Sequence, residues 1–191
     1  MLDKTIPYAE IWMYLPQNIP ITEPSLPEGF HFEFYQPGDE LDWATIETAV
    51  LEFEKESQAV DYFKKKFSPY STELKQRMLF VVTSSGEKVG TCTAWWKEVP
   101  NGTRYPLVHW VAVKPGYQGK GLARAMMNYT LILLNKLEST SPAYLHTQTW
   151  SHVAIRFYQQ LGFVLSDKNL DGSPNPDYLK TIEILEKINA T

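Results

Sequence analysis

The chain has 191 residues, of which 43% are hydrophobic and 21% are charged, and its formal net charge is −4. This length supports one domain with a sizeable core, and the composition is that of a soluble globular protein, which excludes a disordered chain. The weak negative charge excludes the electrostatic footprint of a nucleic-acid-binding protein, and no basic run indicates binding to a membrane surface.

Cysteine and histidine usage limits the chemistry further. The single cysteine, Cys92, excludes an internal disulfide framework and favours a reducing compartment; its neighbours predict a small core residue. The four histidines lack the spacing of a helical metal pair, so we expect no metal site. The N-terminus lacks the pattern of a signal peptide, and no run approaches the ~20 apolar residues of a membrane span. We therefore expect a cytoplasmic protein.

Residues 1–28 combine repeated prolines with aromatic side chains. The prolines argue against a long helix or a central strand, and the aromatic residues argue against a free tail. We expect an extended arm packed on a single domain that spans residues 29–191. The prolines are Pro7, Pro16, Pro20, Pro24 and Pro27.

Hydrophobic periodicity predicts the remaining elements in chain order. The predicted strands are residues 30–35, 78–83, 88–96, 107–113, 144–149, 163–165 and 181–184, and the predicted helices are residues 41–53, 57–67, 122–137 and 153–161. Residues 166–178 are predicted to form a polar loop. This order indicates an α/β fold with a mixed central sheet and helices on both faces.

A glycine-rich loop joins a predicted strand to a strongly amphipathic helix at residues 118–123. Helix N-termini leave N–H groups unpaired and carry a partial positive charge, so they attract anions. Gly119 and Gly121 allow close approach and a positive φ angle, while Lys120 and Arg124 add positive charge. The loop therefore predicts a pyrophosphate cradle, and the alternative interpretation is a tight turn without a ligand.

Two other phosphate-binding motifs fail on the same residues. A P-loop needs a glycine where Lys114 stands and a hydroxyl residue where Gly121 stands. A dinucleotide-binding motif needs a third glycine where Arg124 stands. The loop therefore matches neither of these two nucleotide-binding motifs.

Two motifs in the right order resemble the GNAT N-acetyltransferase superfamily. The first is Gln118-x-x-Gly121-x-Ala123, which is similar to the coenzyme A motif of that family, and the second is Ala154-x-x-Phe157-Tyr158-x-x-Leu161-Gly162-Phe163. The resemblance covers residues 78–165 well, residues 30–77 by element order only, and residues 1–28 not at all. It implies the GNAT fold, acetyl-CoA as acyl donor, and transfer of the acyl group to a primary amine by an N-acyltransferase.

The resemblance also implies roles for individual residues. The Val111 amide would polarise the acyl carbonyl, and the backbone of Val111, Ala112 and Val113 would hold the pantetheine arm. The amides of Gln118, Gly119, Lys120, Gly121, Leu122, Ala123 and Arg124 would hold the pyrophosphate. Tyr158 would protonate the sulfur of coenzyme A, although helical spacing also permits a core aromatic residue. Ser151 stands where many relatives have asparagine; it can still cap the helix, with the coenzyme A contact altered or lost.

The base that removes the amine proton has several candidates. His109 stands two residues before Val111, where several relatives place a glutamate or histidine, and its ordinary pKa of ~6.5 suits proton removal. Strand alternation predicts that His109 and Trp110 lie on opposite faces. A hydrogen-bonded core histidine is the alternative, and His146 and Gln148 form a reserve pair.

The sequence leaves the acceptor open. A small-molecule or peptide amine fits the chemistry, as does an acyl group larger than acetyl, and a homodimer is not excluded. A rival interpretation is a non-catalytic domain of the same fold that binds acyl-CoA as a sensor or interaction module.

Overall fold

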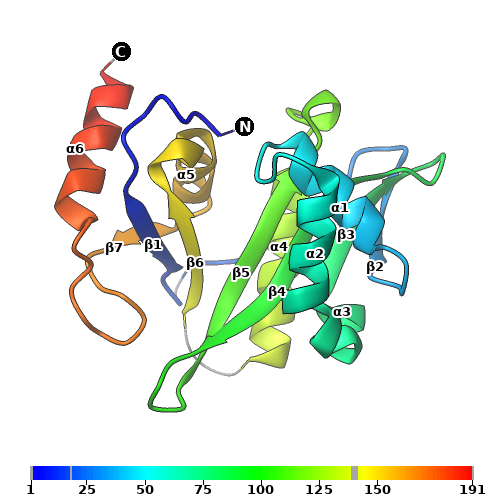
Figure 1. Ribbon diagram of the computed structural model, residues 1–191, viewed down its shortest axis with the longest axis horizontal. Helices are drawn as coiled ribbons and strands as arrows, with labels where there is room; N and C mark the ends of the chain where they lie inside the picture. Colours follow the sequence, from blue (N-terminus) through cyan, green and yellow to red (C-terminus); the bar gives the residue numbers. More distant parts are fainter. Residues whose placement is uncertain (1, 18, 139–141, 191) are drawn as a thin grey trace. The chain divides into compact units, whose positions relative to one another are not determined.

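The computed structural model of the chain describes residues 2–17, 19–138 and 142–190 (Figure 1). Its backbone contacts divide into two compact units. Unit 1 comprises Met1–Pro20, Trp96–Leu107 and Glu138–Thr191, and unit 2 comprises Ile21–Trp95 and Val108–Leu137. Two long strands, β4 (Lys88–Glu98) and β5 (Arg104–Val113), run through both units.

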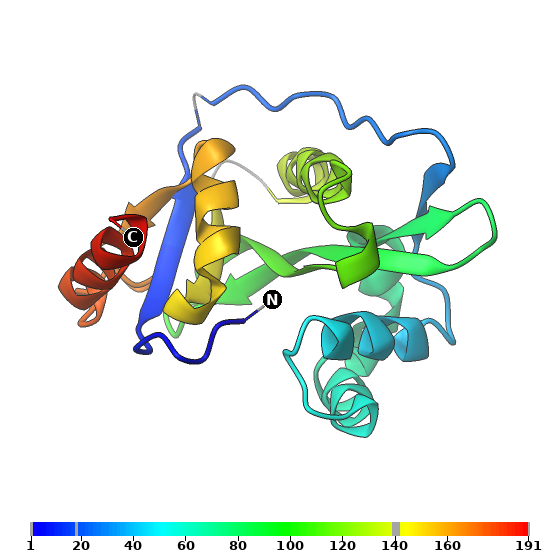
Figure 2. The ribbon, with the colours of Figure 1, turned by 90° about the horizontal axis from the view of Figure 1, so that it is seen from above.

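Helices lie on both faces of the strands of unit 2, as Figures 1 and 2 show. Its strands are hydrogen-bonded in the order β2-β3-β4-β5. The expected mixed sheet with helices on both faces is therefore confirmed. The elements that complete unit 2 are β2 (Phe30–Phe34), β3 (Met78–Thr83), α1 (Glu40–Ala49), α2 (Glu56–Lys66), α3 (Ser71–Arg77) and α4 (Leu122–Leu137).

An aromatic core fixes α1 and α2 on the sheet of unit 2. Trp43 of α1 and Phe63 of α2 are fully buried, with ring centroids 5.3 Å apart, and Phe67 completes the group 5.6 Å from Trp43. Such ring pairs add to the free energy of simple apolar burial. Cys92 is fully buried in β4, which confirms the expected core residue, and burial raises the pKa of its thiol to about 12.

Two sequence predictions within unit 2 need correction. The first predicted helix, residues 41–53, ends early because Leu51 adopts a left-handed φ of 71°, which an α-helix cannot continue. The short helix α3 was not predicted, since its seven residues are too few for a clear period.

Unit 1 is built around a strand from the N-terminal segment. β1 (Glu10–Leu15) pairs antiparallel with β6 (Ala143–Gln148) on one side and with β7 (Val164–Ser166) on the other. These strands continue the sheet as β5-β6-β1-β7. Helices α5 (His152–Gln160) and α6 (Tyr178–Asn189) belong to the same unit.

The arm predicted for residues 1–28 is therefore wrong over β1. Its six residues contain no proline, so every N–H remains available for pairing, and the prolines flank the strand instead. The boundary expected after residue 28 stays a prediction, and the backbone contacts group the chain from Ile21 onward with unit 2.

The last predicted strand, residues 181–184, is also wrong, because these residues lie inside α6. Four residues cannot separate a period of 2 from a period of 3.6, and the buried pair Thr181 and Ile184 has helical spacing.

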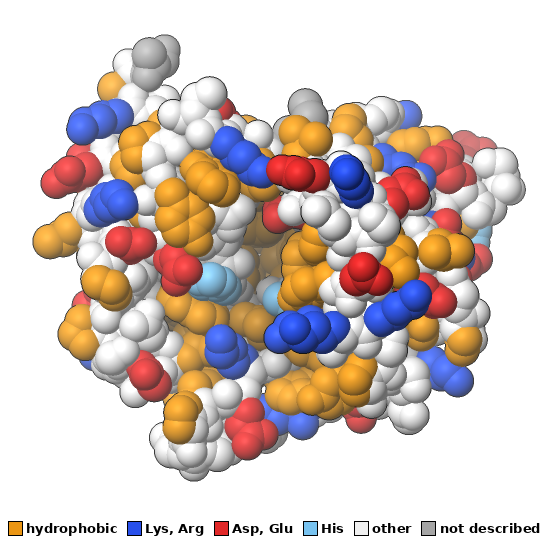
Figure 3. All heavy atoms as spheres, in the orientation of Figure 1, with side chains coloured by type: hydrophobic (Ala, Val, Ile, Leu, Met, Phe, Trp, Pro, Cys, Tyr) orange, Lys and Arg blue, Asp and Glu red, His pale blue; other side chains and the backbone are white. Residues whose placement is uncertain are grey.

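The surface drawn in Figure 3 mixes lysine and arginine side chains with acidic ones. Within the described ranges, no helix is long and apolar enough to cross a membrane. Across those same residues, no group of three His, Cys, Asp or Glu side chains is placed to hold a metal ion.

Candidate functional site

The glycine-rich loop leaves β5 through a short turn, Pro115–Tyr117, and enters α4 at Leu122. Gly119 and Gly121 have φ angles of 75° and 82°, which confirms the predicted positive φ. A Cβ atom added to either glycine would meet no heavy atom within 4 Å. The loop therefore needs these glycines for their backbone conformation rather than for space.

Hydrogen bonds to Glu87 tie the start of the loop to the turn between β3 and β4. The carboxylate accepts bonds from Lys114 Nζ at 2.9 Å and from Tyr117 Oη at 2.7 Å. These bonds, with that of Lys114 foremost, lower the pKa of the Glu87 carboxyl. The loop is thus held in place by side chains of its own unit.

The first turn of α4 follows the glycine-rich loop directly. The N–H of Ala125 donates to the carbonyl of Gly121 at 3.1 Å, so the N–H groups before Ala125 have no carbonyl within the helix to bond. This 16-residue helix directs its positive end at the loop. Lys120 and Arg124 are exposed beside it, and Lys120 Nζ lies 5.4 Å from the ring centroid of Tyr117. The arrangement can hold a multiply charged anion.

Gln118 acts within the loop. Its side-chain amide donates to the Val113 carbonyl at 2.8 Å, and its backbone N–H donates to the Pro115 carbonyl at 3.3 Å. The N–H predicted to hold pyrophosphate is therefore already engaged in a turn. The Val113 carbonyl keeps a second lone pair, so it can still accept a bond from a ligand.

A positive φ angle occurs within β5, at the residue immediately before Val111. Trp110 has a φ of 52°, which is uncommon for a bulky residue and is typical of strained positions at functional sites. The ring centroids of His109 and Trp110 lie 5.5 Å apart, and both side chains adjoin the aromatic core through Phe67 and Trp43. The predicted alternation, with His109 and Trp110 on opposite faces, is therefore wrong at this point.

The residues on either side of Trp110 differ in exposure. Val111 is half-buried, whereas Ala112 and Val113 are buried. His109 is half-buried, and its ring lies edge-on to that of Phe67 at 6.0 Å. This packing is compatible with both interpretations of His109.

A buried carboxyl in α1 was missed from the sequence. Glu47 is 1% exposed, its Oε1 atom has no hydrogen-bond partner in the structure, and burial raises its pKa well above the ordinary value. The spacing in the sequence could have indicated this burial, because Glu47 follows the buried Trp43 by four residues and therefore lies on the same helix face.

Unit 1 holds the second sequence motif on α5 and its C-terminal turn. The N–H of Phe163 donates to the Tyr158 carbonyl at 3.0 Å and that of Gly162 to the Gln159 carbonyl at 3.0 Å, which is the Schellman pattern. Gly162 has a φ of 96°, so the predicted C-cap is confirmed. Tyr158 is 7% exposed and lies beside the ring of Phe163.

Ser151 occupies the N-cap position of α5, but its side chain makes no capping hydrogen bond. Its hydroxyl accepts a bond from the Gln148 amide at 3.3 Å instead. The predicted capping role of the serine side chain is therefore wrong, while its position at the helix start is as expected.

The sheet with helices on both faces defines an α/β protein, and its glycine-rich loop leads into the N-terminus of α4. Residues 41–163 match the acetyltransferase (GNAT) family, so the chain belongs to that family. Members of this family use acetyl-CoA as acyl donor.

Among curated relatives, the chain is 27% identical over 159 residues to a mycothiol acetyltransferase of Streptomyces coelicolor, covering 80% of this chain and 48% of that protein. A mycothiol acetyltransferase of Salinispora tropica is 26% identical over 152 residues, with 78% and 49% covered. The chain spans about half the length of these curated relatives.

Solved structures share the fold. A GCN5-related N-acetyltransferase from Sphaerobacter thermophilus has a TM-score of 0.64 at 21% identity, with 84% of this chain and 49% of that chain covered. Arabidopsis thaliana Naa50, in complex with a bisubstrate analogue, has a TM-score of 0.57 at 18% identity, with 77% and 91% covered.

Proposed function

We propose that this chain is an N-acetyltransferase that moves the acetyl group of acetyl-CoA to a primary amine by direct transfer in a ternary complex. The observation that carries the proposal is the loop with Gly119 and Gly121 in positive φ, which leads from strand β5 to the N-terminus of α4. Such a helix end binds phosphate groups without further side chains.

The proposed coenzyme A contacts follow from this geometry and from the family. The amides that precede Ala125 would hold the pyrophosphate, with charge added by Lys120 and Arg124. The backbone of Val111, Ala112 and Val113 would hold the pantetheine arm. Ser151, at the start of α5, would make a further contact with coenzyme A.

The proposed chemistry needs three groups. The Val111 amide would polarise the acetyl carbonyl, and the phenol of Tyr158 would give a proton to the departing sulfur. A histidine would accept the proton of the amine, whose pKa is ordinarily near ~10.4, and His109 and His146 are the candidates. Cys92 supports direct transfer, because its raised pKa keeps the buried thiol protonated and unreactive.

For the amine that accepts the acetyl group, the proposal names only a chemical class. The curated relatives are mycothiol acetyltransferases, and Naa50 was captured with a peptide-based analogue, so both a small molecule and a peptide N-terminus are reasonable acceptors to test. The sequence alternative of a non-catalytic acyl-CoA sensor has no specific observation in its favour.

Release of free thiol from acetyl-CoA over a panel of amines tests the proposal. The panel should contain amino sugars, amino-thiols, polyamines and short peptides with free N-termini. We expect thiol release that depends on one amine class and stoichiometric formation of its N-acetyl product by mass spectrometry. Tight binding of acetyl-CoA without turnover on any amine would favour the sensor.

A further inference from the structure

Three half-buried aromatic side chains of unit 2 pack against one another beside the buried ring of Trp43. The ring centroids of Phe53 and Trp110 lie 5.6 Å apart with an interplanar angle of 19°, and that of Tyr62 lies 5.2 Å from Trp110. The Trp43 centroid lies 5.2 Å from that of Trp110 and 5.9 Å from that of Phe53. We refer to Phe53, Tyr62 and Trp110 as the ring cluster; it joins α2 and β5 through the connection that follows α1.

Both non-glycine residues that have a positive φ in the described part of the chain border the ring cluster. Trp110, with a φ of 52°, belongs to the cluster, and Leu51, with a φ of 71°, precedes Phe53 by two residues. Such strained positions persist only where the surrounding contacts stabilise them, and they concentrate at ligand-binding and active sites. The backbone on two sides of the cluster is therefore of the kind found at binding sites.

A buried carboxyl lies on the same face of α1 as Trp43. Glu47 is 1% exposed, and neither its Oε1 atom nor the indole N–H of Trp43 has a hydrogen-bond partner among residues 2–17, 19–138 and 142–190. Buried polar groups without partners are rare in proteins and often have a functional reason. The N–H of Glu52 donates to the Glu47 carbonyl at 3.1 Å, so a second acidic residue stands at the same end of α1.

Electrostatic effects link Glu47 to the ring cluster. Burial raises the pKa of Glu47 well above its ordinary value, and the Glu52 carboxylate raises it further. Burial also raises the pKa of the Tyr62 phenol, the Trp110 indole lowers it, and the charge of Glu47 raises it. Burial raises the pKa of the Cys92 thiol to about 12, and Glu47 contributes to this rise. Glu47 therefore holds a proton at pH values where an ordinary carboxyl has lost it, and a cation beside the cluster would favour its ionised form.

We propose that the ring cluster and Glu47 form a binding site for an organic cation that carries a primary or methylated ammonium group. The faces of indole, phenol and phenyl rings attract such cations, and ionised Glu47 supplies the opposite charge. The inference goes beyond the proposed function and uses residues of unit 2 only. Two sources share this chemistry, namely the amine that accepts the acetyl group and a separate cationic effector.

An organic cation fits these groups better than two alternative ligands. A neutral apolar ligand would contact the rings but would leave Glu47 protonated. A metal ion needs several oxygen or nitrogen ligands, whereas the site offers one buried carboxyl and the faces of three rings. The combination of ring faces with a carboxyl is therefore matched by a charge that is spread over carbon and nitrogen atoms.

Binding of tetramethylammonium tests the site without turnover, because this cation has no N–H group and cannot be acetylated. NMR titration of the unmodified chain should show saturable shifts, the largest of them at the indole N–H signals of Trp43 and Trp110. The neutral alcohol tert-butanol has a similar size and shape and should bind at least ~10-fold more weakly. Equal affinity for the two molecules would overturn the proposal.

A matched pair of substitutions locates the binding site. Phe53→Leu removes one ring face and should weaken tetramethylammonium binding by about 3- to 10-fold. Phe32→Leu is the control, because Phe32 is a half-buried ring of the same unit that packs against Tyr129 on α4 at 5.0 Å. Thermal unfolding should show that both variants are folded. Equal weakening in the two variants would contradict the location of the site.

Glu47 gives the site a signature that ring contacts alone cannot produce. Calorimetry in two buffers of different ionisation enthalpy counts the protons that are released when tetramethylammonium binds. Near pH ~6 the unmodified chain should release up to about one proton, whereas Glu47→Gln should release none and bind ~10-fold more weakly. No release by the unmodified chain, or release that persists in Glu47→Gln, would overturn the role of Glu47.

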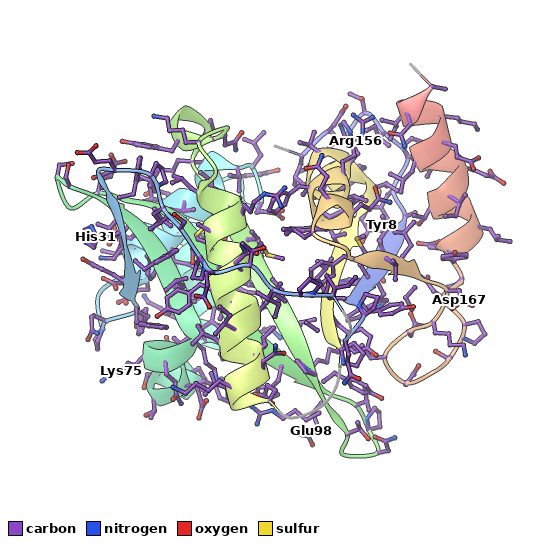
Figure 4. All side chains as sticks on the ribbon, turned by 180° about the vertical axis from the view of Figure 1, so that it is seen from behind. Tyr8, His31, Lys75, Glu98, Arg156 and Asp167 are labelled. Carbon is purple, nitrogen blue, oxygen red and sulfur yellow. The ribbon has the colours of Figure 1, made fainter. Side chains whose placement is uncertain are left out.

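Glu33→Gln is the control for this charge change. Glu33 is an exposed carboxylate that lies 3.0 Å from His31, and Figure 4 shows His31 on β2, the edge strand of unit 2. The variant should match the unmodified chain in affinity and in proton release. Loss of proton release in Glu33→Gln would show that the released proton does not come from Glu47.

Inhibition kinetics separates the two sources of the cation. If the cation is the acceptor, tetramethylammonium should raise KM for the acetylated amine at constant kcat; a change in kcat at constant KM assigns the site to an effector. The proposed function is tested separately. Binding of tetramethylammonium without turnover on any amine overturns the proposed function and supports the site, whereas turnover without such binding overturns the site alone.

Discussion

The side-chain amide of Gln118 donates a hydrogen bond of 2.8 Å to the backbone carbonyl of Val113. This bond joins the glycine-rich loop to the end of β5, five residues earlier in the chain. Gln118 therefore holds the loop in the conformation that presents the N–H groups of α4.

Replacement of Gln118 by leucine removes this bond at nearly constant size. We expect a loss of about 1 kcal/mol in the free energy of unfolding and a rise of ~10-fold in KM for acetyl-CoA, because the loop must then be ordered by the ligand. Chemical denaturation and steady-state kinetics measure the two effects. Gln160→Leu, at an exposed position on α5, is the control. Equal KM values in Gln118→Leu and the unmodified chain would contradict the role.

Gly121→Ala tests the backbone requirement of the loop. A Cβ atom meets nothing within 4 Å there, so the expected cost of about 1–2 kcal/mol arises from the φ of 82° alone. Gly116→Ala is the matched control, because Gly116 has equal space and no positive φ. We expect weaker acetyl-CoA binding by calorimetry in Gly121→Ala only. Equal losses in both variants would mean that conformation is not the cause.

Glu47 makes the stability of the chain depend on pH. Its folded-state pKa is raised, so its contribution is complete below the ordinary pKa of 4.5 and is lost as the pH rises toward the folded-state value. Glu47→Gln keeps the shape and removes the titration. The Tm of the variant minus that of the unmodified chain should therefore increase between pH 5 and pH 8. A difference that stays constant over this range would show that Glu47 is ionised in the folded protein.

The sequence predicted those elements whose own residues show a clear apolar period or a turn glycine. The helix that begins at Leu122 has apolar residues at steps of three and four. Gly121 and Gly162 indicated turns, and both residues adopt positive φ there. The order of these local signals was enough for the glycine-rich loop and the C-terminal end of α5.

The rest depended on tertiary pairing that no local pattern records. β1 lies between strands that follow it by more than 120 residues in the chain. The prolines that flank β1 therefore led to the wrong expectation of an arm without a central strand. The positive φ of Trp110 has no sequence signature, because a bulky residue is the least expected one there. The same pairing brings Glu10 to His146, which explains why the sequence indicated His146 as a candidate but not Glu10.

The most direct test of the central claim is an amide NMR titration of the unmodified chain with acetyl-CoA. We predict that the largest shifts occur at the amides of Gly119, Lys120, Gly121 and Leu122, followed by those of Val111 and Val113. Saturable shifts at a different set of residues, with the amides of this loop unmoved, would contradict the account.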